Sequence, residues 1–264
     1  MNHSLFYVND KILMWNYPSE IFRAFKKIYI MTYMFDASIM YYYFKLNGIN
    51  FQKKSIINES ENYVLCDYFK PDVRQLFKDL IQIDKTNIVQ RKDTALSSKW
   101  FDKADGSTKA NIKFSIYNWV RNIAKAKSND VMWTTFLKCK HKLQGKGYTN
   151  GFVEWNCKAT NEYSDKKYLV YALNVYPHVG ITQFFSQYEI VVNQDLFALS
   201  EMIQWVWRSA IRNGEKIRIL IISDRMRFLF DEWLKGSLEY KPNTTKVLKS
   251  SKKPLNKGDS RGTC

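Results

Sequence analysis

Apolar and polar positions alternate along the chain in blocks that predict strands and helices in turn. Uninterrupted β-branched and aromatic runs predict strands, whereas apolar residues that recur every three or four positions predict helices. The predicted strands are residues 28–33, 63–66, 130–136, 152–156, 168–173 and 217–222. The predicted helices are residues 20–26, 37–46, 71–83, 107–127, 136–143, 179–188, 197–213 and 225–234. Apolar strands that alternate with helices predict an α/β fold, with a mostly parallel sheet covered by helices on both faces.

The helix predicted over residues 197–213 carries the clearest candidate chemistry. Its apolar stripe consists of Leu199, Ile203, Val206 and Ala210. Gln204, Arg208 and Arg212 follow one another at four-residue spacing, so a helix would place their side chains on one side. Two guanidinium groups one turn apart suit a multiply charged anion such as a triphosphate. The alternative is a solvated helix face whose arginines meet surface carboxylates.

The expected place for a ligand is the edge of the sheet at which the strands end. In open parallel sheets, ligands bind outside the carboxyl ends of the strands. Thr160 and Asn161 lie in a polar loop, and both this loop and the arginine helix are candidates for that edge.

Composition adds a strong positive charge to this picture. The 264 residues carry a formal net charge of +16, and 45% of them are apolar, which supports a sizeable core. An excess of this size favours a polyanionic partner, most often nucleic acid. Residues 241–264 contribute +6 and contain Pro, Gly, Ser and Asn, so we predict a disordered basic tail there.

Neither a metal site nor a membrane segment is predicted. The four cysteines form no C-x-x-C pair, which is typical of reduced thiols in a cytosol. The first ten residues lack a long apolar stretch, and the aromatic run over residues 29–44 is too short to span a bilayer. We therefore expect a cytoplasmic protein.

Four short segments resemble, in order, the later motifs of superfamily 2 helicase-like ATPases. They are residues 30–36 (IMTYMFD), 131–136 (VMWTTF), 158–163 (KATNEY) and 204–214 (QWVWRSAIRNG). The similarity is to a branch encoded by bacteriophages and mobile elements of low-GC Gram-positive bacteria, and it covers residues 15–48 and 107–235. The resemblance implies a RecA-like lobe with a mostly parallel sheet.

The resemblance also implies a domain order and a set of site residues. Residues 1–48 would be the remnant of a first RecA-like lobe, 49–106 an insert or linker, 107–240 the second lobe and 241–264 the tail. The implied site residues are Thr32 and Tyr33 in the motif that couples hydrolysis to lobe movement, Gln204 as a nucleotide contact, Arg208 and Arg212 as nucleotide-binding and catalytic arginine fingers, and Thr160 and Asn161 as nucleic-acid contacts. Arginine fingers stabilise transition-state charge in phosphoryl transfer, and Arg212 is the favoured one here.

The motifs that hold the nucleotide phosphates are missing from the sequence. There is no G-x-x-x-x-G-K-[ST] loop, and no Asp-Glu pair follows an apolar strand before Thr32. ATP and Mg²⁺ would bind only if a separate polypeptide supplied these first-lobe motifs. The predicted function is thus the C-terminal part of a phage-type ATP-dependent DNA helicase or translocase, an NTP hydrolase that is inactive alone, as in a truncated or split gene product.

Two other functions stay open at this point. The chain could be a non-catalytic basic protein that binds nucleic acid. It could also be a standalone hydrolase or nuclease with the carboxylates of Asp195 and Glu201, or Asp224 and Glu232, although no paired-carboxylate or histidine constellation is recognisable.

Overall fold

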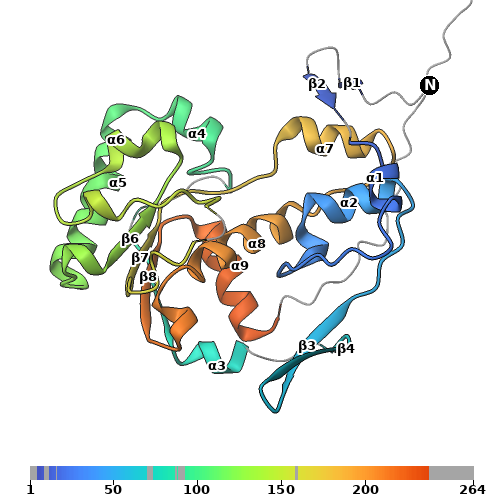
Figure 1. Ribbon diagram of the computed structural model, residues 1–264. Coiled ribbons are helices and arrows are strands. Elements are labelled where there is room, and N and C mark those ends of the chain that lie inside the picture. The colour runs from blue at the N-terminus through green and yellow to red at the C-terminus, as the bar shows by residue number, and fades with distance from the viewer. Residues whose placement is uncertain are drawn as a thin grey trace, which may run out of the picture.

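The main body of the protein is a four-stranded parallel sheet between two layers of helices (Figure 1). The computed structural model describes residues 5–8, 12–15, 17–69, 74–86, 88, 93–157 and 160–237. The strand order is β5 (Ile81–Asp84), β8 (Ile217–Ile221), β7 (Tyr168–Tyr171) and β6 (Val131–Thr134), with all neighbours parallel. The predicted α/β fold with a parallel sheet is confirmed.

Each face of the sheet is covered by its own helical layer. Helices α8 (Gln194–Val206) and α9 (Asp224–Lys235) pack on one face, together with inward residues such as Leu169 and Ile219. The opposite face carries Val170 and Leu220. It is covered by α4 (Ser98–Lys103), α5 (Gly106–Asn118), a π-helical turn (Trp119–Ile123) and α6 (Lys140–Leu143). Because successive strand residues point to opposite faces, strands buried on both sides are apolar throughout.

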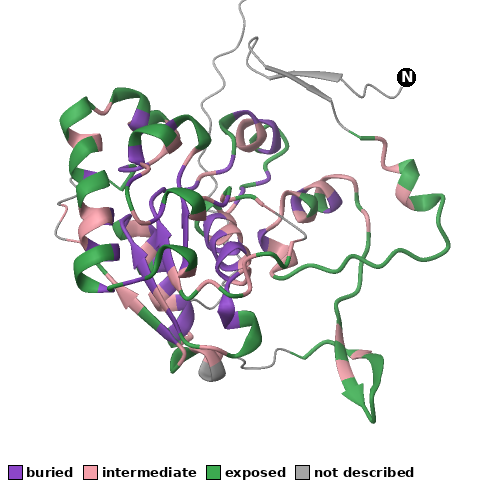
Figure 2. Cartoon of the chain, turned by 60° about the vertical axis from the view of Figure 1, so that its left-hand side comes forward, coloured by how far each residue is buried: buried purple, intermediate pink, exposed green. Residues whose placement is uncertain are grey.

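The remaining elements lie beside this body. Helices α1 (Glu20–Arg23) and α2 (Ile39–Leu46) precede the sheet, and α2 packs against α7 (Val179–Ser186) in a small separate core. Strands β1 (Leu5–Val8) and β2 (Ile12–Trp15) form one hairpin, and β3 (Lys54–Glu59) and β4 (Asn62–Asp67) form another. Figure 2 shows that buried residues gather in the sheet and α8, whereas the β3–β4 hairpin is largely exposed.

The helix predicted over residues 71–83 is wrong. The structure has a short helix α3 (Arg74–Lys78), followed by the strand β5. Leu80 and Ile83 match helical spacing, but Ile81 and Ile83 also alternate with polar residues, and pairing with β8 decides the outcome. The sheet therefore begins at residue 81, inside the segment that we expected to be an insert.

The buried strand predicted over residues 28–33 is also wrong. The described structure assigns no strand to this segment, and Tyr29 and Met31 are 66% and 86% exposed. A strand needs a neighbour that accepts and donates backbone hydrogen bonds, and the described residues place none beside this segment. Similarly, residues 152–156 form only an isolated parallel bridge between Phe152 and Trp133.

The helix predicted over residues 197–213 is shorter than expected. Helix α8 ends at Val206, and a separate 3-10 turn covers Ala210–Asn213. Ser209 interrupts the helix because its hydroxyl donates to the Val206 carbonyl at 2.7 Å, while the Ala210 amide bonds to the Lys166 carbonyl of another loop. The basic tail predicted for residues 241–264 lies outside the described residues.

Candidate functional site

The predicted arginines lie at the amino ends of the strands, not at the expected carboxyl ends. The turn after α8 leads through Gly214 (φ 73°) into β8, and the loop that carries Thr160 and Asn161 leads into β7. Backbone hydrogen bonds join the two segments, from Ala210 to Lys166 and from Arg218 to Lys167. The loops precede neighbouring strands, so they lie side by side at the opposite edge from the one we predicted.

Four of the predicted site residues meet at this edge. Arg208 Nη1 donates to the Thr160 carbonyl oxygen at 3.2 Å, and Arg212 Nη1 donates to Asn161 Oδ1. We call Arg208, Arg212, Thr160 and Asn161 the arginine cluster. Gln204 instead donates to Ser200 Oγ at 3.1 Å, one turn back along α8. The cluster therefore unites two sequence elements that lie about fifty residues apart, without Gln204.

The positive charge of the arginine cluster is not neutralised by a carboxylate. Among the described residues neither guanidinium forms an ion pair, and Glu215 pairs with Lys167 at 2.6 Å. The Nε atom of Arg208 is buried and has no hydrogen-bond partner among the same residues, whereas Arg212 is exposed. A buried donor without an acceptor is unfavourable, so an anion that reaches this edge would gain charge-assisted hydrogen bonds.

Tyr33 contacts the same helical layer through aromatic side chains. Burial raises the pKa of its hydroxyl, and the neighbouring Trp233 side chain opposes that rise. The Trp233 ring packs edge-on against Trp207 at 6.2 Å between centroids, and Trp207 directly precedes Arg208. Thr32 is exposed and donates only to the Tyr33 carbonyl, at 3.4 Å. The two residues therefore lie outside the arginine cluster, two aromatic rings away in the case of Tyr33.

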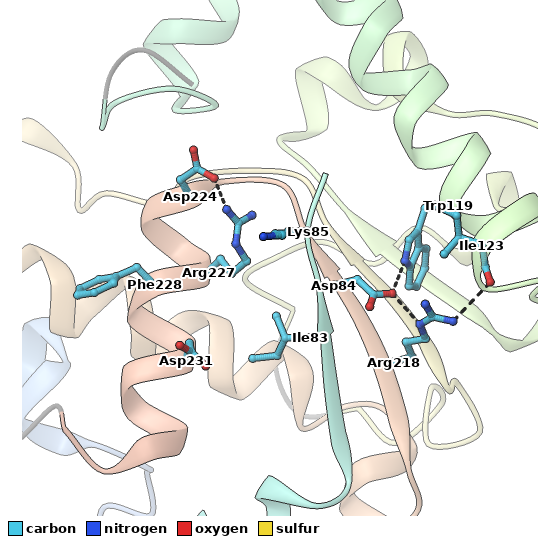
Figure 3. Close-up of a pocket in the computed structure, with 10 residues that line it drawn as sticks. All are labelled: Ile83, Asp84, Lys85, Trp119, Ile123, Arg218, Asp224, Arg227, Phe228 and Asp231. Atoms are coloured by element: carbon cyan, nitrogen blue, oxygen red, sulfur yellow. Dashed lines mark hydrogen bonds and ion pairs between the residues drawn. The ribbon is translucent and has the colours of Figure 1, made fainter. Parts of the chain in front are cut away.

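A second site at the carboxyl end of β5 was missed from the sequence. A cavity of about 640 Å³ surrounds this strand end, and Figure 3 shows its lining. Asp84 Oδ2 accepts hydrogen bonds from Trp119 Nε1 and Arg218 Nε, both at 2.6 Å. The alternation of Ile81, Gln82, Ile83 and Asp84 was the available signal, and the helix prediction concealed it.

The residues that line the cavity at β5 have no net charge. Three carboxylates (Asp84, Asp224, Asp231) and three cations (Lys85, Arg218, Arg227) line it. Arg227 pairs with Asp224 and donates to the Ile221 carbonyl oxygen at 2.8 Å. Since the lining carries no excess charge and its guanidiniums already have partners, the arginine cluster is the stronger candidate for an anion. The described residues contain no group of three His, Cys, Asp or Glu that could hold a metal ion.

In the described part of the chain, no helix is both long and apolar enough to cross a membrane.

The comparisons with known proteins identify a phage-associated α/β family. The model of the YonV C-terminal Rossmann-like domain matches residues 75–234, which include all four strands of the parallel sheet. The SPbeta prophage-derived uncharacterized protein YonV of Bacillus subtilis (strain 168) is 42% identical over 233 residues. These residues cover 86% of this chain but 57% of that protein, so the chain spans little more than half of its relative. No solved structure matches the chain.

Proposed function

The chain belongs to the family of the YonV C-terminal Rossmann-like domain, and from this premise we propose that it forms the C-terminal part of a phage-type ATP-dependent DNA helicase or translocase. In this proposal the chain supplies arginines and nucleic-acid contacts, and another lobe supplies the phosphate-binding loop. The observation that carries the proposal is the arginine cluster, in which two helicase-like motifs meet in space.

Arg212 is the proposed arginine finger. Its guanidinium is exposed, and its bond to the neutral amide oxygen of Asn161 can be exchanged for stronger bonds to a γ-phosphate. Arg208 is half-buried and anchored to the Thr160 carbonyl, so it would add charge from a more fixed position. The two cations would stabilise the charge that develops during phosphoryl transfer.

The exposed segment over residues 28–33 supports the need for another lobe. It has the composition of a buried strand, yet Tyr29 and Met31 are largely exposed. A contiguous exposed apolar segment is typical of a surface that a partner covers. We propose that it adds to the sheet of the lobe that brings the phosphate-binding loop, and that ATP and Mg²⁺ bind between that lobe and the arginine cluster.

A non-catalytic protein that binds nucleic acid is the second candidate, favoured by the net charge of +16. In that case the arginine cluster would contact phosphates of the nucleic acid rather than a nucleotide. The two functions predict different consequences when the arginines are removed.

The decisive experiment is to co-express the full chain with the reading frame encoded immediately upstream and to measure DNA-stimulated ATP hydrolysis. The test variant is Arg208→Ala with Arg212→Ala, and the control is Lys216→Ala, an exposed cation that lies close to Arg212 in the sequence. We expect the double variant to lose hydrolysis by about 10³-fold, in the range known for arginine fingers, while DNA binding is unchanged.

Two outcomes contradict the proposal. Full hydrolysis by the double variant would exclude the arginine-finger role. The second outcome combines three results: the upstream product carries no phosphate-binding loop, ATP hydrolysis is not detected, and the double variant binds DNA more weakly than the wild-type chain. These results together would favour the non-catalytic function.

A further inference from the structure

The net charge of the chain is concentrated in one helical layer. Residues 99–146 contain eleven lysines and arginines but three aspartates, a formal net charge of +8, which is half of the total. The tail over residues 241–264 carries a further +6, so all other residues together contribute only +2. The segment 99–146 includes α4, α5, the π-helical turn, β6 and α6, and its helices form one side of the molecule in Figure 1.

The cations of this layer lie close together in space. Burial raises the pKa of the Cys139 thiol, and the charges of Lys138 and Lys109 oppose that rise. Lys142 acts in the same way and the Asp102 carboxylate in the opposite one, so three cations and one carboxylate from α4, α5, the 3-10 turn and α6 act on this side chain. Helices α5 and α6 also pack against each other.

Arg121 and Lys146 extend the same surface. A Cβ atom on Gly147 would lie 2.9 Å from Arg121 Cδ, so the arginine packs along the loop that carries Lys146. Arg121, Lys113, Lys142 and Lys146 are exposed, and none has an ion pair within the described chain. We call Lys109, Lys113, Arg121, Lys138, Lys142 and Lys146 the basic layer.

We propose that the basic layer binds the sugar-phosphate backbone of a nucleic acid. The twelve helical steps from Lys109 to Arg121 rise about 18 Å, which matches about five phosphates of one strand. Phe114 lies on the same helix, is 67% exposed and can stack on an unpaired base. Lys138 is paired with Asp102 at 2.6 Å, so the four exposed members without an ion pair in the described chain, Lys113, Arg121, Lys142 and Lys146, are the ones that fit a polyanion.

This inference rests on the part of the proposed function that makes nucleic acid the partner, but it uses a different surface. The basic layer covers the face of the sheet opposite to α8 and α9, whereas the arginine cluster follows α8 at the amino edge. DNA binding and nucleotide hydrolysis can therefore be lost separately.

The test compares two charge-reversal variants of the full chain. The first is Lys113→Glu, Arg121→Glu, Lys142→Glu and Lys146→Glu. The matched control is Lys26→Glu, Lys27→Glu, Lys45→Glu and Lys78→Glu, four exposed lysines outside the layer, which change the net charge equally. Both retain the basic tail. Binding to a fluorescein-labelled 30-nucleotide single strand is measured by anisotropy over a series of KCl concentrations, after circular dichroism has verified folding.

We expect the first variant to bind at least tenfold more weakly and its salt dependence, as the slope of log K against log [KCl], to fall by about 3, since each lost phosphate contact removes about 0.7 for a single strand. The control should keep the wild-type slope. Glutamine at the same four positions gives a second variant that removes the charge without reversal, and it should lose affinity in the same direction.

Equal binding by the first variant and the control would overturn the proposal, because charge elsewhere, including the tail, would then suffice. Binding of the wild-type chain to vesicles with 30% phosphatidylserine, but not to the oligonucleotide, would also overturn it. Loss of oligonucleotide binding together with intact hydrolysis in the co-expression experiment would support the basic layer and leave the arginine-finger role standing.

Discussion

Asp84→Ala tests whether β5 is held in the sheet as the structure describes. The carboxylate is the shared acceptor of Trp119 Nε1 and Arg218 Nε, both at 2.6 Å. Trp119 is 2% exposed and the Arg218 side chain 27% exposed, so water replaces the lost acceptor only in part. The substitution leaves one buried N–H and one half-buried guanidinium without their main partner.

The expected loss of stability is about 2–4 kcal/mol. An unpaired buried donor costs about 1–3 kcal/mol, and removing one partner of a fully buried ion pair costs about 3–5 kcal/mol. The expected loss is smaller than the sum of these two costs. Arg218 retains partial access to water, a hydrogen bond to the Ile123 carbonyl and a position over the Trp119 ring.

The assay is urea unfolding of the full chain at pH 7, followed by circular dichroism. With a slope of about 3 kcal/mol per M urea, the midpoint should fall by about 1 M. The control is Asp67→Ala, whose ion pair with Lys54 lies at the surface and whose loss should not move the midpoint. In a double-mutant cycle, Arg218→Met should make Asp84→Ala less costly. A wild-type midpoint for Asp84→Ala would refute this account of β5.

Two further predictions concern the other elements around the sheet. Gly151→Ala should destabilise the chain strongly, because a Cβ atom there would lie 2.1 Å from the Val131 carbonyl oxygen. The control is Gly106→Ala, which should not destabilise the chain because the space around Gly106 is open. The thermal unfolding midpoints of the two variants are compared. Hydrogen bonds from Thr108 and Ser107 lower the pKa of Asp105, which caps α5. The cap therefore stabilises the fold above the unfolded-state pKa and is lost as the pH falls through the folded-state pKa. The decrease in thermal midpoint caused by Asp105→Ala should therefore be largest at pH 7 and should shrink as the medium is acidified.

The sequence predicted β6, β7 and β8, which are buried on both faces, and missed β5, which lies at one edge of the sheet. Strand β7 is a continuous apolar run and β8 is a run that only Arg218 interrupts, so a solvated helix is no alternative for either. Strand β5 has four residues, and Ile83 fits both the helical spacing that continues from Leu80 and the strand alternation with Ile81. Residues 28–33 show the opposite error, a predicted strand that the structure does not form. Their composition is that of a strand, but composition does not specify which segment would pair with it.

The arginine cluster was predicted in its members but not in its geometry or place. Four-residue spacing put Arg208 and Arg212 on one helix, whereas α8 ends at Val206, before both of them, and Arg212 lies in a separate 3-10 turn. Their meeting with Thr160 and Asn161 depends on loops that precede neighbouring strands, and strand order is not readable from spacing. The Asp84 site was missed together with β5, because its three members, Asp84, Trp119 and Arg218, come from three separate elements.

The strand order also sets the order in which this protein can fold. Strand β5 comes first in the sheet's chain order, yet its one neighbour among the described strands is β8, the last of these four in the sequence. During translation the backbone groups of β5 therefore stay unpaired until β8 has been synthesised and has paired with β7. Long-range parallel pairing of this kind slows folding and prolongs exposure to aggregation. Translation that stops before residue 217 would leave β5 without a partner, so chaperone dependence should be greatest for such incomplete chains.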